Sequence, residues 1–450
     1  MKSIAANKRV TRENFLKFNI WVILGIFVVL FLGYAIAYEN WFYLGALLVP
    51  LLLYLSIEKP FIFPFGLYVF LLPFDSILSV ADSTTFTKFI GALTIPVLLL
   101  KSLHEKKLRL PNKASIYWVF LMIYAMLSIF WAINPDNVLS RYATVTGLLI
   151  LYLIVSSYKI HESEFNTCKW CILLGGLMAA ILAIYNYETG VFDKAGRATM
   201  AYGERSGDPN YFAFCLLLPV SICIEKILNQ KKKVLKFMFS AVLSTIILGI
   251  IVTGSRGGML GVCVIFITYI LCMKQRITLL AILIIMGIII TSFFSIIFIE
   301  RWGQAIETGG SGRVDIWIAG FSSLKNFCVV GAGLGNFPNV FADFGHFTPF
   351  TRVVFKDPHN IYLEIFVELG IVGFSLLILA MRRHYQVIKS RFDYHDSNQA
   401  MLKAAFWALL TSSFFVGTLF LKSFWLFWMM ILMYGNIMDK EVYKHNRGSE

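Results

Sequence analysis

The sequence has few charged residues. Only 15% of its 450 residues are Asp, Glu, Lys or Arg, whereas 58% are hydrophobic. A water-soluble globular chain carries roughly 25% charged residues, so this composition excludes a large soluble domain. Apolar runs close to the ~20 residues that cross a bilayer as a helix recur along the whole length. We therefore predict an all-α, polytopic integral membrane protein with about 12–14 transmembrane helices.

Cysteine pairs and metal-binding patterns are also scarce. Cys168 and Cys171 form one closely spaced pair, with no second pair to complete a zinc site. No group of His, Asp or Glu has the spacing of metal ligands. No Gly-x-Ser-x-Gly segment predicts a serine nucleophile. We therefore expect no metal and no cofactor.

The net charge of +14 could indicate nucleic-acid binding, but the placement of the basic residues argues against it. Lys and Arg cluster in short loops that alternate with apolar runs, and the tail 1–18 is basic. Because such loops stay in the cytoplasm, we predict that both termini are cytoplasmic. The first apolar run, 20–37, is too long for a cleavable signal peptide. Several histidines lie on this predicted inner side, where we expect solvent exposure: His104, His161, His384, His395 and His445.

The apolar runs also predict the domain organisation. Spans are expected near 20–37, 41–57, 61–73, 87–101, 116–133, 142–157, 169–186, 210–227, 235–252, 257–273, 277–298, 360–380, 403–420 and 423–438. We divide the chain into N-terminal spans (1–186), a core region (187–380), and C-terminal spans with a cytoplasmic tail (381–450). The core contains a predicted extracytoplasmic loop, 299–359, which is far longer than the roughly 2–8 residues that usually connect helices.

Polar residues gather where this loop ends. Pro358 suits the first position of a helix, so a helix is predicted to start there, with His359 and Asn360 at its mouth. Backbone N–H groups are unsatisfied at such a start, and the helix dipole is positive. Glu364 and Glu368 are four residues apart and share one face of this helix. At least one carboxylate should point into the bundle, because a lipid-facing carboxylate is costly.

Two further patterns lie inside the long loop. Val314, Trp317, Phe321 and Leu324 recur at helical spacing, which predicts an amphipathic helix lying flat on the outer membrane surface. The glycine-rich segment 331–335 follows no strand pattern, so it predicts a flexible turn or re-entrant backbone and not a dinucleotide-binding loop.

Arginine is concentrated in the predicted outer segments. The residues are Arg197, Arg205, Arg256, Arg301, Arg313 and Arg352. The planar guanidinium group binds phosphate oxygens through paired hydrogen bonds and stays charged near neutral pH. A single arginine at the edge of a span could equally bind lipid headgroups. Several arginines that converge near a histidine would instead indicate an anionic ligand.

Several segments between about residues 190 and 375 together resemble the O-antigen ligase and O-antigen polymerase superfamily. His359-Asn360, followed after nine residues by Gly370-Ile371-Val372-Gly373, is similar to the superfamily's His-Asn and Gly-x-x-Gly pattern. The other matching segments are an Asp-Pro-Asn-containing stretch at 197–210, Ser-Arg-Gly-Gly at 255–258, and the run of Arg313, Trp317, Gly331 and Gly333.

This resemblance implies a glycosyltransferase of the integral-membrane type, active at the extracytoplasmic face of the bacterial cell membrane. Its donor would be a glycan joined through diphosphate to undecaprenyl, and its acceptor a sugar hydroxyl on a glycan or a lipid-linked sugar. The implied reaction needs no metal and inverts the anomeric centre. Ligases and polymerases share these motifs, so the resemblance does not distinguish them. The expected partners are these substrates and membrane lipids, without nucleic acid.

On this reading, His359 accepts a proton from the acceptor hydroxyl or orients it, and Arg256 and Arg313 bind the diphosphate. The expected substrate-binding residues are Arg197, Arg205, Asn210, Asn360, Glu364 and Glu368.

Two other interpretations stay open. A transporter or flippase of an anionic lipid-linked substrate would also use outward arginines. However, transporters often have internal repeats and polar groups at the bilayer midplane, whereas this chain has no clear repeat and its polar residues crowd one surface. A wall-glycan polymerase of the shape-and-division type would share the chemistry but not the His-Asn motif.

Overall fold

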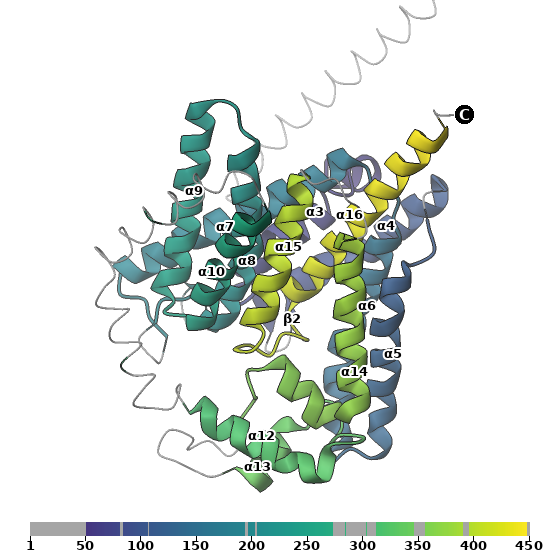
Figure 1. The fold of residues 1–450 in the computed structure, drawn as a ribbon, viewed down its shortest axis with the longest axis vertical. Helices are drawn as coiled ribbons and strands as arrows, with labels where there is room; N and C mark the ends of the chain where they lie inside the picture. The colour runs from purple at the N-terminus through teal and green to yellow at the C-terminus, as the bar shows by residue number, and fades with distance from the viewer. Residues whose placement is uncertain are drawn as a thin grey trace, which may run out of the picture.

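The computed structural model is a bundle of helices (Figure 1). It describes residues 51–81, 84–106, 108–193, 197–202, 205–272, 284, 303, 312–345, 356–389 and 396–447. Within these ranges, regular strands form only two short hairpins, β1 (Ser79–Ala81) with β2 (Thr84–Thr85) and β3 (Ala201–Tyr202) with β4 (Arg205–Ser206). The predicted all-α class is confirmed.

The α-helices, in chain order, are α3 (Phe65–Leu71), α4 (Phe86–His104), α5 (Ile116–Leu127), α6 (Pro135–Ser157), α7 (Glu162–Glu188), α8 (Pro209–Asn229), α9 (Lys233–Val252), α10 (Arg256–Cys272), α12 (Arg313–Phe327), α13 (Phe337–Phe344), α14 (Ile361–Lys389), α15 (Ser397–Ser412) and α16 (Lys422–Arg447). In the described chain, 7 helical segments are long and apolar enough to cross a membrane. The chain is therefore a multi-pass membrane protein.

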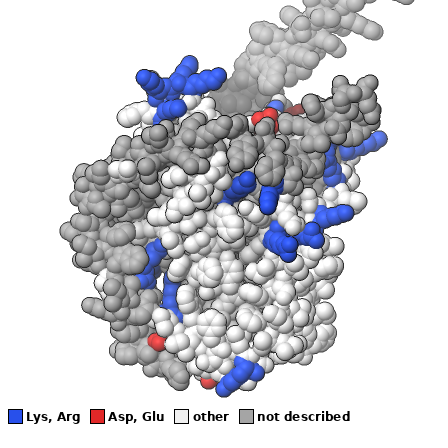
Figure 2. Space-filling model, in the orientation of Figure 1, with Lys and Arg blue, Asp and Glu red and all other residues white. Residues whose placement is uncertain are grey.

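The surface of the bundle agrees with a membrane location. Large apolar side chains are exposed along single helices, for example Phe89, Leu93 and Leu100 on α4. On the face seen in Figure 2, uncharged residues cover most of the described surface, and Lys and Arg appear in small separate groups. Such exposed apolar area suits contact with lipid chains and not with water.

Helix α8 is the centre of one half of the bundle. It packs against α7, α9, α10 and α15, and most of its side chains are buried. Helices α12 and α13 cover one end of the bundle, where α12 packs on α14 (Figure 1). Helix α8 is therefore held on several sides.

Several predicted boundaries need correction. Helix α6 begins at Pro135 and not near 142, because the Asn134 side chain accepts a hydrogen bond from the Asp136 N–H (3.0 Å) and caps a polar first turn. Helix α15 ends at Ser412 and not at 420. The predicted spans near 20–37 and 277–298 lie wholly or almost wholly outside the described residues, so the total number of spans stays a prediction.

His384 was expected to be solvated but is buried. Its Nε2 lies 2.8 Å from the Tyr152 hydroxyl and its Nδ1 lies 2.7 Å from the Ala380 carbonyl oxygen. Trp118 and Trp428 pack around the ring. The imidazole joins α5, α6, α14 and α16, which explains why a polar side chain is tolerated in this apolar interior.

The predicted helix is present as α12, but its predicted apolar stripe is only partly its packing face, since Trp317 and Leu324 pack against a buried cluster. Ile316 and Ala319 are buried against the neighbouring helices, whereas Val314 and Phe321 are about half exposed (48% and 60%). Exposed apolar side chains on this helix are compatible with contact with a membrane surface, which stays a prediction.

Helix α14 is kinked at Gly370, where the backbone leaves helical geometry (φ 61°, ψ −163°). The kink frees two carbonyl groups in the preceding turn, which accept hydrogen bonds from the N–H groups of Ala332 (2.9 Å) and Gly333 (2.8 Å). The segment 331–335 is thus a turn fixed to α14 by hydrogen bonds, and its glycines have positive φ. Gly370, the first glycine of the Gly-x-x-Gly pattern, therefore allows this turn to dock on α14.

We expect Gly370→Ala to destabilise the protein. A Cβ at this position would lie 2.2 Å from the Val329 carbonyl oxygen, in a backbone conformation that residues with side chains rarely adopt. Such strain costs about 1–3 kcal/mol, which should lower the melting temperature of the purified protein in detergent. Gly147→Ala is the matched control, because a Cβ there meets nothing within 4 Å. Equal melting temperatures for the two variants would contradict the proposed role of the kink.

Candidate functional site

The start of α8 organises the candidate site. The Asp208 carboxylate caps the helix by accepting hydrogen bonds from the N–H groups of Asn210 (2.6 Å) and Tyr211 (3.3 Å). The Asn210 side chain in turn accepts a hydrogen bond from the Ser255 hydroxyl (3.1 Å). The Asp-Pro-Asn segment is thereby tied to the turn between α9 and α10.

Glycines bring the start of α10 close to its neighbours. A Cβ on Gly258 would lie 2.7 Å from the Ala213 Cβ on α8, and a Cβ on Gly257 would lie 2.9 Å from the Phe415 Cβ. Side chains at these two positions would push α10 away from α8 and from the loop between α15 and α16. The Ser-Arg-Gly-Gly sequence therefore sets the position of Arg256, which is the first residue of α10.

Arg313 faces the same region from the first turn of α12. Its guanidinium carbon lies 5.9 Å from the centre of the Phe415 ring, within the range of a cation–π contact. Burial, followed by the charge of Arg256, lowers the pKa of Arg313 to about 10. The charge of Arg197 acts in the same direction, and Asp208 acts in the opposite one. These four side chains therefore lie within electrostatic range of one another.

We call Arg197, Arg256 and Arg313 the arginine cluster. Arg197 forms an ion pair with Asp193, with Nη2 and Oδ2 2.9 Å apart. Like charges held together in this way repel one another, and an added anion relieves that repulsion. The cluster has the charge and the hydrogen-bond donors that a phosphate or diphosphate requires.

His359 reaches this region from the loop before α14. Its backbone is left-handed (φ 48°), a conformation uncommon for residues with side chains. The Pro358 carbonyl oxygen is fixed by the Trp317 indole N–H of α12 (3.0 Å). The Nδ1 atom of His359 is buried without a hydrogen-bond partner among the described residues. Burial, and then the charge of Arg313, lower the pKa of His359 below its ordinary value of 6.5, so the ring is neutral at pH 7.

Residues 239–378 match the family model described as O-antigen ligase. This match supports the resemblance of the region to the O-antigen ligase superfamily. A search of curated proteins gives no match. The O-antigen ligase region contains Arg256, Arg313 and His359, whereas Arg197 and Asp208 precede it.

Within the O-antigen ligase region, the predicted start of α14 at Pro358 is wrong. The helix begins at Ile361, and the Asn360 side chain caps it by accepting hydrogen bonds from the N–H groups of Tyr362 (3.0 Å) and Leu363 (3.2 Å). An Asn cap satisfies two of the free N–H groups at a helix start, which a proline ring cannot do. Its oxygen is therefore engaged in the protein, and Asn360 positions the neighbouring His359.

Glu364 and Glu368 of the O-antigen ligase region are both buried. The Glu368 carboxylate accepts hydrogen bonds from the N–H groups of Gly335 (2.8 Å) and Phe337 (3.0 Å), so it holds the start of α13. A Cβ on Gly417 would lie 2.8 Å from Oε2 of Glu364, and that oxygen has no hydrogen-bond partner among the described residues. The Glu368 carboxylate thus supports the loop before α13, whereas the Glu364 carboxylate lies against Gly417.

Arg141 is an arginine that the sequence analysis missed. It lies on α6 with Nη2 3.5 Å from Oδ1 of Asp357, and its guanidinium carbon is 4.7 Å from the Phe420 ring centre. It thus contacts the loop that carries His359. Arg141 lies directly before the predicted span at 142–157. A charged residue at the edge of a helix is ordinary, so this position gives no functional signal.

Other predicted residues lie elsewhere or are not described. The Arg205 side chain donates to the Ile77 carbonyl oxygen (3.4 Å) at the exposed edge of β4. Arg301 and Arg352 lie outside the described residues. In the described part of the chain, no three His, Cys, Asp or Glu side chains lie close enough to hold a metal ion. The expectation that no metal is needed stays a prediction.

Proposed function

We propose that this protein is a glycosyltransferase that transfers or polymerises glycan from an undecaprenyl-diphosphate-linked donor onto a sugar hydroxyl. The observation that carries the proposal is that Arg313 lies within electrostatic range of both Arg256 and His359. The O-antigen ligase match over 239–378 supports the same class of reaction. The core region 187–380 would hold the whole site at the extracytoplasmic face of the cell membrane, with both termini in the cytoplasm.

The proposed reaction is a single displacement. The acceptor hydroxyl oxygen forms a bond to the anomeric carbon as the bond from that carbon to the phosphate oxygen breaks. The bonding electron pair stays on the diphosphate, whose negative charge increases, and Arg256 and Arg313 stabilise that charge. The hydroxyl proton passes to His359, which is neutral at pH 7 and can accept it. Attack opposite to the leaving group inverts the anomeric centre.

Reconstitution tests this proposal. The purified protein in proteoliposomes, supplied with an undecaprenyl-diphosphate-linked glycan and an acceptor, should release one undecaprenyl diphosphate for each glycan transferred. Movement of the intact donor across the membrane without bond cleavage would contradict the proposal and indicate a transporter or flippase.

A deletion strain separates ligase from polymerase. Loss of a polymerase should leave single repeat units on the acceptor, whereas loss of a ligase should leave the acceptor bare. Gel banding of the cell-envelope glycan reads this difference directly.

A further inference from the structure

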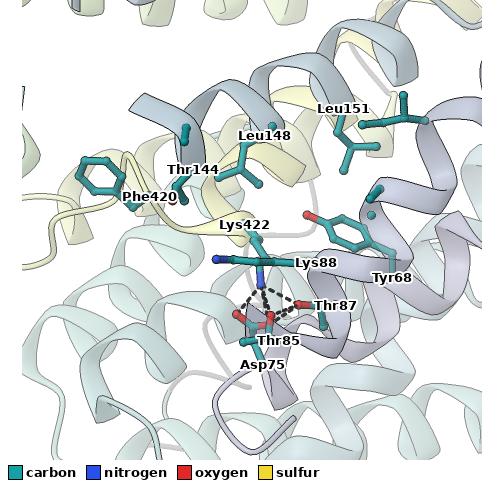
Figure 3. Close-up of a pocket in the computed structure, with 15 residues that line it drawn as sticks. Tyr68, Asp75, Thr85, Thr87, Lys88, Thr144, Leu148, Leu151, Phe420 and Lys422 are labelled. Atoms are coloured by element: carbon teal, nitrogen blue, oxygen red, sulfur yellow. Dashed lines mark hydrogen bonds and ion pairs between the residues drawn. The ribbon is translucent and has the colours of Figure 1, made fainter. Parts of the chain in front are cut away.

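A second cavity lies apart from the arginine cluster, between α3, α4, α6 and the start of α16 (Figure 3). Its volume is about 560 Å³, within the roughly 300–1,000 Å³ of known ligand pockets. Polar groups line one end and apolar side chains such as Leu148 and Leu151 line the other. The cavity therefore suits a ligand with a polar head and an apolar body.

The polar end is built around the ammonium group of Lys422. It lies 2.6 Å and 2.7 Å from the two carboxylate oxygens of Asp75, and it donates to the hydroxyl groups of Thr85 and Thr87 (2.7 Å each). Lys88 adds a second ammonium group to the lining. Two lysines and one carboxylate leave this end of the cavity positively charged, which favours an anionic ligand group.

Tyr68 supplies an independent sign of a ligand. Its side chain is 1% exposed, and its hydroxyl has no hydrogen-bond partner among the described residues. Figure 3 shows this hydroxyl pointing into the cavity toward Lys422. An unpaired buried hydroxyl costs free energy, and a ligand hydroxyl or phosphate oxygen in the cavity would satisfy it.

The cavity opens between α4 and α6. Small residues line both helices there, and Ala92, Ala143 and Gly147 are exposed. A Cβ on Gly147 would meet no atom within 4 Å. Since α4 and α6 are candidate membrane spans, this opening would face lipid in the membrane, and a long apolar chain could leave through it.

A smaller cavity of about 180 Å³ lies next to this site and extends to the start of α8. It shares Asp75, Thr85 and Lys422 with the larger cavity, and it is also lined by Asp208 and Tyr211 at the start of α8. Asp208 also acts electrostatically on Arg313 and His359, so this cavity reaches a residue that belongs to the candidate site.

We propose that the larger cavity binds the lipid-linked acceptor, with its anionic, hydroxyl-rich head beside Lys88, Lys422 and Tyr68 and its chain passing out between α4 and α6. This inference rests on the proposed function. The smaller cavity would lead the acceptor sugar from Lys422 toward His359, while the donor diphosphate occupies the arginine cluster.

A photoreactive polyprenyl-phosphate probe tests the site without requiring transfer. Cross-linking of the probe to the wild-type protein in nanodiscs should label peptides from α4 and α6. Gly147→Phe fills the open wall and should reduce this labelling at least tenfold. Ile150→Phe is the matched control, because Ile150 is 42% exposed on the same helix and does not line the cavity. Labelling that is equal in both variants would overturn the proposal.

Tyr68→Phe provides a second variant that removes only the unpaired hydroxyl. It should raise the acceptor KM several-fold without changing the donor KM, whereas a purely structural hydroxyl would leave both constants unchanged.

The cross-linking experiment has a second outcome that would overturn the proposal. Labelling of α4 and α6 that is abolished by Arg313→Ala but kept in Gly147→Phe would mean that the probe occupies only the donor site. Absence of any glycan transfer in the wild type, with labelling intact, would contradict the proposed function and not this site.

Discussion

Arg313→Ala is expected to lower the rate of glycan transfer about 10²–10³-fold, the usual loss for one preorganised group that stabilises charge in the transition state. The guanidinium group is partly desolvated and is held by the first turn of α12 and by the Phe415 ring. Its charge is therefore in place before the diphosphate leaves. An initial-rate assay with saturating donor and acceptor measures the loss.

Two further variants show whether charge or geometry is responsible. Arg313→Lys keeps the charge but loses the planar pair of donors, so we expect a loss of about tenfold or more. Arg383→Ala removes an arginine from the far part of α14, where it contacts Gln386, and should leave the rate unchanged. A wild-type rate in Arg313→Ala would exclude this residue from the reaction.

His359→Gln is expected to lower transfer by about 10²–10⁴-fold, because the amide side chain cannot accept the proton of the attacking hydroxyl. Folding should be retained, since the Trp317 and Asn360 contacts on either side involve the Pro358 carbonyl and the Asn360 side chain and not the imidazole. Activity at wild-type level with an unchanged melting temperature would remove His359 as the base.

The pH profile gives a separate check on His359. Burial and the charge of Arg313 lower its pKa below 6.5, so the neutral, proton-accepting form should persist below that pH. The transfer rate should therefore stay level from pH 8 down to about 6.5 and fall only in more acid solution. In Arg313→Lys the neighbouring charge remains, and the acid limb should stay at its wild-type position. If the rate of the wild type already falls well above pH 6.5, the assignment of His359 as the base is contradicted.

The sequence predicted the helices well where a local signal exists. Apolar runs placed α7, α8, α9 and α10 within a few residues, except for the early start of α7, and the helical spacing placed α12. The missed start of α6 depends on a polar first turn capped by Asn134, which carries no apolar signal.

The site was predictable only in part. Motif resemblance selected Arg256, Arg313 and His359, whose roles stay predictions. The supporting contacts join residues far apart in the chain, such as Arg141 with Asp357, and no local pattern records such a pairing. The kink at Gly370 likewise depends on a close approach to Val329. The cavity near Lys422 arises from four separate segments, none of which has a recognisable motif.

The most direct test of the account is the affinity of undecaprenyl diphosphate for the purified protein in nanodiscs, measured for the wild type, Arg256→Ala, Arg313→Ala and the double variant. If both arginines bind one diphosphate, each single variant should weaken binding, and the double variant should differ from the sum of the two by about 0.5–3 kcal/mol. Wild-type affinity in both single variants, or strictly additive losses, would contradict a shared diphosphate site.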